Sequence, residues 1–358
     1  MNPVYDAQSF DFSGYRMPAE WEPHEATWLA WPANPETWPE HMEQARQVYA
    51  QMIAALSQHE TVFVLAQGCE ADDSIEAHLS QHPCQRDRIR ICHIPYNDSW
   101  MRDAGPIFIT HPGHAQHPIV AHDFIFNAWG KKYEPYDADD AIPQHALRLL
   151  NLPMIQHDFV LEGGSIDVNG QGCVLTTRQC LLNPNRNPTL SQEQIESRLK
   201  RYLGVTQVLW LDNGIEGDDT DGHVDDITRF VSPRRIFTVV ENNRQDANYE
   251  PLLNNAQKLR EMRDQDGNPF EVIELPMPDI RVEGPFGRSP ASYANFLIAN
   301  NCVLVPVYSA PNQNEALSLF RDAFPDRQIV PIECSGLVAG LGSIHCVTQQ
   351  QPKVSSLS

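Results

Sequence analysis

Two kinds of hydrophobic spacing alternate along the chain. Amphipathic patterns with a helical period predict helices over 36–58, 70–81, 138–150, 190–203, 246–264 and 312–323. Between them, short runs rich in β-branched and aromatic residues predict strands at 27–31, 61–66, 88–94, 207–211, 270–275 and 328–332. Helices that alternate with strands indicate an α/β protein. No Gly/Ser linker, charge block or low-complexity stretch interrupts the pattern, so we expect one domain over residues 1–358.

A hairpin pattern recurs within this alternation. Strand pairs joined by tight turns begin at Gly105, Gly163, Gly222 and Ser292, and a last strand, SIHCVTQ, begins at Ser343. The hairpin starts are roughly 60 to 70 residues apart, a period typical of repeated supersecondary units arranged around an axis. Alternatively, the chain is an ordinary α/β protein without a structural repeat, and its hairpins have this spacing by chance.

Residues with chemical potential lie at the hairpin entrances. Asp103 precedes the first hairpin, Glu162 precedes the second, His223 and Asp225 open the third, and Cys346 lies in the last predicted strand. His223 and Asp225 are two positions apart in a segment that reads as strand, so their side chains should share a face. If the units surround an axis, these segments bring a thiol, an imidazole and three carboxylates to one pocket.

Each segment also has a simpler interpretation. GDDTDGHVDD (217–226) suits a glycine-rich acidic loop with a surface histidine, and its H-x-D pair suits a metal site, although the sequence has no H-E-x-x-H, H-x-H or thiolate cluster. Glu162 before Gly-Gly suits a tight turn. Trp100 and Arg102 suit a turn cluster in NDSWMRDAGP (97–106), whereas Trp100 beside acidic residues also suits a flat cation.

The cysteines differ in their surroundings. The eight cysteines are scattered singly without a C-x-x-C pair, which is typical of reduced thiols in a cytosolic enzyme. Cys346 follows a glycine-rich loop, and glycines allow a ligand to approach a sulfur closely. The adjacent His345 should point to the opposite face of the predicted strand, so His223 is the better candidate for a general base.

Charge narrows the possible ligands. The net charge is −21, from 26 Lys and Arg against 47 Asp and Glu, which disfavours nucleic acid and anionic membrane and favours cations. No apolar run reaches the roughly 18 residues of a membrane-spanning helix, and the N-terminal segment lacks the pattern of a secretory signal. We therefore expect a cytoplasmic protein.

Taken together, the segments resemble the guanidino-group-modifying superfamily. The similarity is greatest to its agmatine deiminase branch, which is related to the Porphyromonas-type peptidylarginine deiminases. The matching stretches run nearly end to end in the order EWEPHEATWLAWP (20–32), NDSWMRDAGP (97–106), NAWG (127–130), LEGGSIDV (161–168), LNPNRNP (182–188), GDDTDGHVDD (217–226) and SIHCVTQQQP (343–352).

This resemblance implies a fold and a catalytic set. The fold is a pseudo-fivefold α/β propeller of ββαβ-type units around a central pocket. Cys346 matches the family nucleophile, His223 the general acid/base and Glu162 its carboxylate partner. The implied reaction hydrolyses agmatine to N-carbamoylputrescine and ammonia through a covalent cysteine thioether, without a metal or an organic cofactor. A homodimer or higher assembly is also implied.

The resemblance extends to substrate binding. Asp103 and Asp225 match the pair that grips the guanidinium, and Trp100 matches an aromatic residue of the pocket wall. The distal amine of agmatine favours acidic neighbours, for which Asp218 and Asp219 are candidates, although the sequence GDDT also suits the cap of a turn.

Several departures and rival functions remain open. The family usually has GGGNIHC where this chain has Leu341 and Ser343, and many relatives have His in place of Asp167. A deiminase of peptidyl or free arginine is one rival, with Arg281 or Arg288 as the partner of an α-carboxylate. A metal-dependent amidohydrolase that uses His223 and Asp225, or a non-catalytic polyamine-binding protein, are more remote alternatives.

Overall fold

The computed structural model describes residues 3–354 and has a mixed α/β fold. Five sheets repeat one arrangement, in which an antiparallel hairpin is followed by a third strand parallel to the second. In chain order, four of these sets are β5–β6–β7 (Ile107–Thr110, Ile119–Ile125, Met154–Val160), β8–β9–β10 (Asp167–Val168, Cys173–Thr177, Gln207–Leu211), β11–β12–β13 (Thr228–Ser232, Arg235–Val240, Glu271–Pro276) and β16–β17–β18 (Leu297–Ala299, Cys302–Val307, Gln328–Glu333).

The fifth set joins the two ends of the chain. β19 (Gln349–Pro352) pairs antiparallel with β2 (His24–Ala30), and β2 pairs parallel with β3 (Thr61–Leu65), which is followed by β4 (Ile89–Cys92). β1 (Val4–Asp6) extends the β5–β6–β7 sheet beyond β7, and β14 (Glu283–Gly284) with β15 (Gly287–Arg288) forms a small separate hairpin. All four sequence-predicted hairpins are therefore antiparallel strand pairs.

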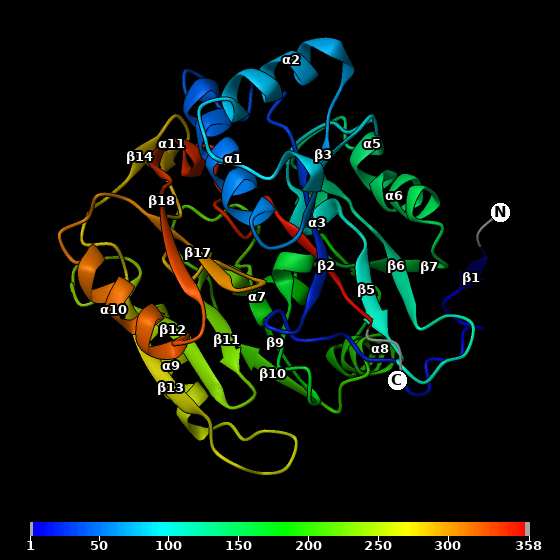
Figure 1. Ribbon diagram of the computed structural model, residues 1–358. Helices are drawn as coiled ribbons and strands as arrows, with labels where there is room; N and C mark the ends of the chain where they lie inside the picture. Colours follow the sequence, from blue (N-terminus) through cyan, green and yellow to red (C-terminus); the bar gives the residue numbers. More distant parts are fainter. Residues whose placement is uncertain (1–2, 355–358) are drawn as a thin grey trace.

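Helices connect the parallel strands of each set. The main crossover helices are α1 (Met42–Ser57), α6 (Ile142–Leu150), α8 (Gln192–Leu203), α9 (Tyr249–Glu261) and α10 (Gln313–Ala323), and α2 (Gly68–Leu79) joins β3 to β4. In Figure 1, α10 lies at the edge of the molecule, outside β17 and β18. Within residues 3–354, every helix is too short or too polar to span a membrane.

Local sequence explains where these helices begin, end and pack. In α8, Ser191 and Gln194 form a capping box, and Gly204 ends the helix in the left-handed conformation with φ of 65°. In α1, Val48, Met52 and other residues at helical spacing are buried against the core. The predicted helices at 190–203 and 36–58 thus correspond to α8 and α1.

Two predicted strand segments are wrong. His223 and Asp225 lie at a short 3₁₀ helix, η3 (Val224–Asp226), because the Asp218 carboxylate accepts hydrogen bonds from the backbone N–H groups of Gly222 and His223 and closes a turn. Cys346 lies in a turn segment, and the strand begins only at Gln349.

Candidate active site

A cavity of about 360 Å³ is lined by four of the seven predicted site residues, Cys346, Asp103, Trp100 and Asp219, whereas His223, Glu162 and Asp225 are not among its lining residues. Cys346 lies in its wall together with six acidic side chains and six aromatic ones, namely Glu36, Asp98, Asp103, Glu134, Asp139, Asp219, Trp100, Phe126, Trp129, Tyr133, Tyr136 and Phe286. No Lys, Arg or His is among the described residues that line the cavity. The cavity is therefore suited to a cation with an apolar stem.

Hydrogen bonds to a distant asparagine hold Cys346. Asn295 Oδ1 accepts from the backbone N–H groups of His345 and Cys346 at 2.9 and 3.3 Å, and Asn295 Nδ2 donates to Cys346 Sγ at 3.0 Å. The Cys346 carbonyl accepts from the Arg102 N–H at 3.1 Å. These bonds occupy the backbone groups that a neighbouring strand would use, which explains why the segment is a turn.

The resting state of Cys346 follows from its surroundings. The residue is 5% exposed, and its Sγ lies 3.9 Å from Asp225 Oδ2. Burial, followed by the negative charges of Asp225, Asp226 and Asp103, raises the pKa of the Cys346 thiol well above its usual value. Before a cation enters the cavity, Cys346 is therefore a thiol.

Asp103 is fixed at the floor of the cavity by two donors. The Gly164 N–H donates to Oδ1 at 2.9 Å, and Trp129 Nε1 donates to Oδ2 at 3.0 Å. Burial, partly opposed by the nearby His223, raises the pKa of Asp103 to about 6. Asp103 is thus ionised at neutral pH.

Gly164 marks the point where the site residues converge. A Cβ at this position would lie 2.5 Å from His223 Nδ1, 2.9 Å from Asp103 Oδ1 and 3.1 Å from Asp225 Oδ2. Only a glycine allows these three side chains to meet. The structure therefore places His223, Asp103 and Asp225 around one point, as the sequence predicted.

His223 lies against Asp103 but has no hydrogen-bond partner. Its Nδ1 is 3.8 Å from Asp103 Oδ1, and neither ring nitrogen is hydrogen-bonded. Burial lowers the pKa of His223, but Asp103, the Cys180 sulfur and Asp225 together raise it well above 6.5. The imidazole is therefore positively charged at neutral pH and holds a proton that it can donate.

Glu162 is fully buried beside His223. Its Oε1 accepts from Arg186 Nε at 2.6 Å, while Oε2 has no partner. Arg186 also donates to Asp221 Oδ2 at 2.7 Å and to the Thr220 carbonyl at 2.7 Å. Arg186 therefore fixes Glu162 relative to the segment that leads to His223.

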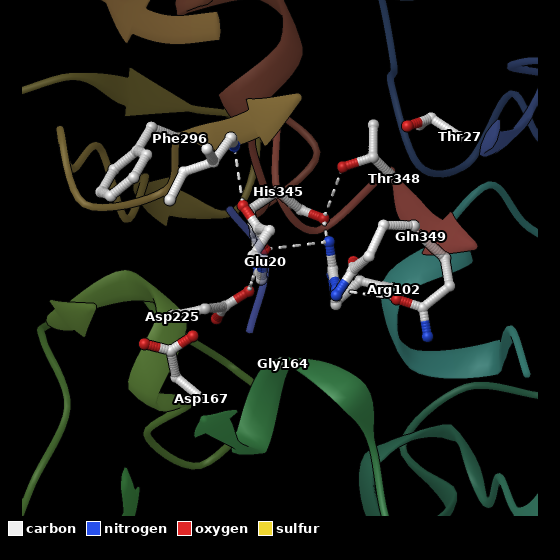
Figure 2. Close-up of polar contacts among 12 residues, drawn as sticks. Glu20, Thr27, Arg102, Gly164, Asp167, Asp225, Phe296, His345, Thr348 and Gln349 are labelled. Atoms are coloured by element: carbon white, nitrogen blue, oxygen red, sulfur yellow. Dashed lines mark hydrogen bonds and ion pairs between the residues drawn. The ribbon is translucent and has the colours of Figure 1, made fainter. Parts of the chain in front are cut away.

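A buried network supports Asp225 from behind. His345 Nδ1 lies 2.7 Å from Asp225 Oδ2, and His345 Nε2 lies 2.7 Å from Glu20 Oε2. An ionised carboxylate only accepts, so each contact needs a ring N–H, whereas burial and the charges of Arg102 and Arg229 lower the pKa of His345 below its usual value. Glu20 in turn pairs with Arg229 at 2.7 Å. Figure 2 shows Asp225, His345 and Glu20 next to one another, with Arg102 alongside.

This network leaves one face of Asp225 free. Asp225 Oδ1 is buried and has no hydrogen-bond partner. Burial acts to raise the pKa of Asp225, but the hydrogen bond and charge of His345 outweigh it and lower the pKa below its usual value. Asp225 is therefore an ionised acceptor next to the sulfur. His345 acts on this carboxylate and does not line the cavity.

The remaining candidate residues divide into two groups. Trp100 and Asp219 line the cavity, and the Tyr133 hydroxyl donates to Asp219. Asp218 instead caps the turn before His223, as the simpler interpretation of GDDT held. Arg281 and Arg288 are paired with Glu216 and other surface acids outside the cavity.

The departures from the family pattern have structural consequences. Leu341 adopts a φ of 74°, a conformation that favours glycine, and it lines the cavity. The Ser343 hydroxyl contacts the Tyr308 hydroxyl at 3.4 Å. Asp167 lies outside the cavity, where it accepts from the Phe230 N–H at 2.5 Å.

Sequence reasoning missed four residues around the catalytic set, which are Trp129, Arg186, Asp226 and Asn295. Trp129 and Arg186 lie within the stretches NAWG and LNPNRNP, which resembled the family but received no role. Asn295 lies at the entrance of the hairpin that begins at Ser292, the position at which the other hairpins supply their chemistry. That regularity was the available signal for Asn295.

Two groups of side chains within residues 3–354 have the spacing of metal ligands. Glu162, Cys180 and His223 form one, and Asp225, Asp226 and Cys346 form the other, with ligand atoms within 4.8 Å of one another in each. His223 and Asp225 fall in different groups. The H-x-D pair on which the metal-dependent rival depends is therefore not itself one of these groups.

Known proteins match the chain over nearly its whole length. The family described as Porphyromonas-type peptidyl-arginine deiminase matches residues 16–352. An agmatine deiminase of Medicago truncatula is 37% identical, with 96% of this chain and 98% of the relative covered. An agmatine deiminase of Pseudomonas aeruginosa is also 37% identical, with 95% and 96% covered.

Solved structures give the same grouping. The agmatine deiminase of Enterococcus faecalis superposes with a TM-score of 0.88 at 35% identity, covering 96% of this chain and 97% of that one. A substrate-bound agmatine deiminase of C. jejuni superposes with a TM-score of 0.86 at 31% identity, covering 97% and 99%. The chain belongs to the Porphyromonas-type peptidyl-arginine deiminase family and, within it, groups with the agmatine deiminases.

Proposed function

We propose that this protein hydrolyses agmatine to N-carbamoylputrescine and ammonia, with Cys346 as the nucleophile. The observation that carries the proposal is the composition of the cavity, where a cysteine and six acidic side chains occur without a single Lys, Arg or His in the described wall. Such a wall favours a substrate that is cationic at both ends and disfavours one with a free carboxylate.

Two carboxylates are positioned to bind the guanidinium. Asp103 and Asp225 both contact the point occupied by Gly164, and Asp225 Oδ1 has no partner within the protein. Carboxylates accept paired N–H groups of a planar guanidinium and fix its plane. Trp100 offers the cation an aromatic face in the cavity wall. The central carbon then lies next to Cys346 Sγ.

Substrate binding would also activate the nucleophile. The carboxylate charges that raise the pKa of Cys346 are neutralised when the guanidinium binds between them, so the thiol loses its proton more easily. The Asn295 Nδ2–H, 3.0 Å from Sγ, donates to the thiolate that forms. The thiolate attacks the guanidinium carbon and gives a tetrahedral adduct.

His223 would then move the protons. The imidazolium donates its proton to the departing amino group, which leaves as ammonia, and an amidino-thioether remains on Cys346. The neutral imidazole takes a proton from a water molecule that attacks the same carbon. Collapse of the second adduct expels the Cys346 thiolate and releases the ureido product. Glu162, held by Arg186, orients His223.

The distal ammonium would lie toward Asp219. This carboxylate lines the cavity and accepts from the Tyr133 hydroxyl. A peptidyl-arginine or free-arginine substrate is the second candidate function, because the family description carries that activity. Free arginine requires a cationic partner for its carboxylate, and Arg281 and Arg288 are both engaged outside the cavity.

The remaining expectations concern fold, location, assembly, ligand class and cofactors. The repeated ββαβ sets are consistent with a pseudo-fivefold α/β propeller around the cavity, and the enzyme is proposed to be cytoplasmic and homo-oligomeric. The acidic charge of −21 supports a small cationic guanidino compound as the ligand rather than nucleic acid or membrane. The reaction sequence requires no cofactor or metal.

Turnover and trapping test the proposal directly. The specificity constant should be highest for agmatine, then arginine, then a blocked arginine peptide, with ammonia as the readout. Protein quenched during turnover should gain mass at the peptide that contains Cys346, and Cys346→Ala should bind agmatine without releasing ammonia. A preference for the peptide, or full activity of Cys346→Ala, would contradict the proposal.

A further inference from the structure

Around His223, the structure contains a group of buried ligand atoms without partners. Glu162 Oε2, His223 Nδ1 and His223 Nε2 are all buried and have no hydrogen-bond partner. Cys180, which is fully buried on α7 (Arg178–Leu181), completes a group whose ligand atoms lie within 4.8 Å of one another. Unpaired buried polar atoms are costly, so such a group is suited to an ion that satisfies them together.

The donor types select the ion. A cysteine sulfur, an imidazole and a carboxylate are the ligands that Zn²⁺ and related thiophilic divalent cations prefer, usually in tetrahedral geometry, and binding displaces the protons of Cys180 and His223. Ligand atoms around a tetrahedral zinc lie about 3.3 to 3.6 Å apart, given metal–ligand bonds of about 2.0 to 2.3 Å. A closing movement of about 1 Å by the side chains brings this group to that spacing. We propose that Glu162, Cys180 and His223 form an inhibitory site for a thiophilic divalent cation such as Zn²⁺.

The site adjoins the cavity at Asp103. Asp103 lines the cavity, and its Oδ1 lies 3.8 Å from His223 Nδ1. A divalent cation that is attracted by the acidic wall meets this carboxylate first and reaches His223 next. Asp103 also provides an acceptor for a water molecule in the fourth position of the metal.

The second ligand group is less suited to the same ion. Cys346 Sγ and Asp226 Oδ1 both accept from Asn295 Nδ2, and Asp225 Oδ2 is bonded to His345. Its sulfur is therefore already hydrogen-bonded, only Asp225 Oδ1 is known to be free, and the group contains no imidazole. The Cys180 group has its imidazole and one carboxylate oxygen free.

Occupation of the site would stop the reaction in two ways. A metal ion on His223 removes the group that carries the proton, and its charge repels a guanidinium that binds to Asp103. Inhibition therefore rests on the proposed function, whereas metal binding does not. Zn²⁺ and agmatine should each weaken the binding of the other.

A binding measurement separates the two claims. Co²⁺ is titrated into the chelator-treated Cys346→Ala protein, and the sulfur-to-metal charge-transfer absorbance reports thiolate ligation. We expect the band in Cys346→Ala, its loss when Cys180→Ser is added, and its retention when Cys302→Ser is added. Cys302 is a matched control because it is fully buried in β17 and outside both ligand groups. Agmatine should reduce the affinity for Co²⁺ in the same protein.

Activity then tests the consequence. Zn²⁺ should inhibit ammonia release by wild type and Cys302→Ser, and Cys180→Ser should need at least about ten times more Zn²⁺ for the same inhibition. A band that is absent from Cys346→Ala, or unaffected by Cys180→Ser, overturns the site and places metal binding elsewhere. If wild type releases no ammonia from agmatine, the proposed function fails, but the Co²⁺ titration still decides whether the site exists.

Discussion

The charge of Asp225 should control the ionisation of Cys346. Asp225 Oδ2 lies 3.9 Å from Cys346 Sγ. Burial is the largest cause of the raised thiol pKa, and the charge of Asp225 is the second largest. Asp225→Asn keeps the size of the side chain and an acceptor for His345 while it removes the charge. Because a neighbouring anion disfavours the thiolate, the substitution should lower the thiol pKa even though it abolishes the grip on the guanidinium.

The distance sets the size of the effect. Two unit charges at this separation interact by about 4 kcal/mol at an effective dielectric constant of about 20, which corresponds to about 3 pKa units. Asp226 should make the fall in the thiol pKa smaller than this. Burial and then the charge of Asp225 raise the pKa of Asp226 well above its usual value. Without that charge Asp226 ionises more readily and restores part of the field. We therefore expect the thiol pKa to fall by about 1 to 3 units.

Alkylation measures this pKa. The rate at which iodoacetamide modifies the Cys346 peptide is followed against pH by mass spectrometry, which separates this thiol from the other cysteines. The midpoint for Asp225→Asn should lie below that of wild type. Asp167→Asn is the control, since Asp167 is also a buried carboxylate but is not among the charges that raise the pKa of Cys346, and its midpoint should match wild type. An unchanged or higher midpoint in Asp225→Asn would refute the electrostatic account of the resting thiol.

Three other predictions use the same site. As pH falls below about 6, kcat/KM for agmatine should decline because Asp103 takes up a proton. As pH rises above the raised pKa of His223, kcat/KM should decline again because the imidazolium is lost. A pH profile of kcat/KM without the decline on the acid side contradicts this. Glu20→Gln should destabilise the protein by about 1.5 to 3 kcal/mol in chemical unfolding, because Arg229 keeps only Asp167 and His345 keeps only Asp225 as a buried counter-charge, and an effect under about 1 kcal/mol contradicts the network. Asp219→Asn should lower kcat/KM for agmatine about tenfold but leave butylguanidine, which lacks the distal amine, unchanged; equal effects on both compounds contradict the assignment.

Hydrophobic spacing and turn residues were sufficient to predict most of the helices and hairpins. The helical period over 190–203 and 312–323 matches α8 and α10, and the turn residues between β11 and β12 mark a real hairpin. These features depend on neighbours within a few residues, so composition and spacing report them. The turn at His223 was missed because it depends on a side-chain cap from Asp218, which competes with strand formation.

The sequence predicted the front layer of the site, meaning the candidate catalytic and guanidinium-binding residues, but not the supporting layer of residues that hold them. The five catalytic and guanidinium-binding candidates do converge, but the residues that fix them come from remote segments. Glu20 and His345 are 325 positions apart, and Asn295 is 51 positions from Cys346. Such contacts leave no mark in hydrophobic periodicity, and a single sequence gives no pairing between distant positions. The supporting layer is therefore visible only in three dimensions.

The two layers together explain how one cavity meets opposing demands. A cation requires ionised carboxylates, but the same charges suppress the thiolate that must attack it. The hydrogen bond from His345 keeps Asp225 ionised, while burial and the neighbouring carboxylates keep Cys346 protonated. In the proposed mechanism, a guanidinium that binds between Asp103 and Asp225 cancels the charges that oppose ionisation of the sulfur. Reactivity is thereby tied to the presence of the correct cation, because a neutral ligand of the same shape would leave the sulfur as a thiol.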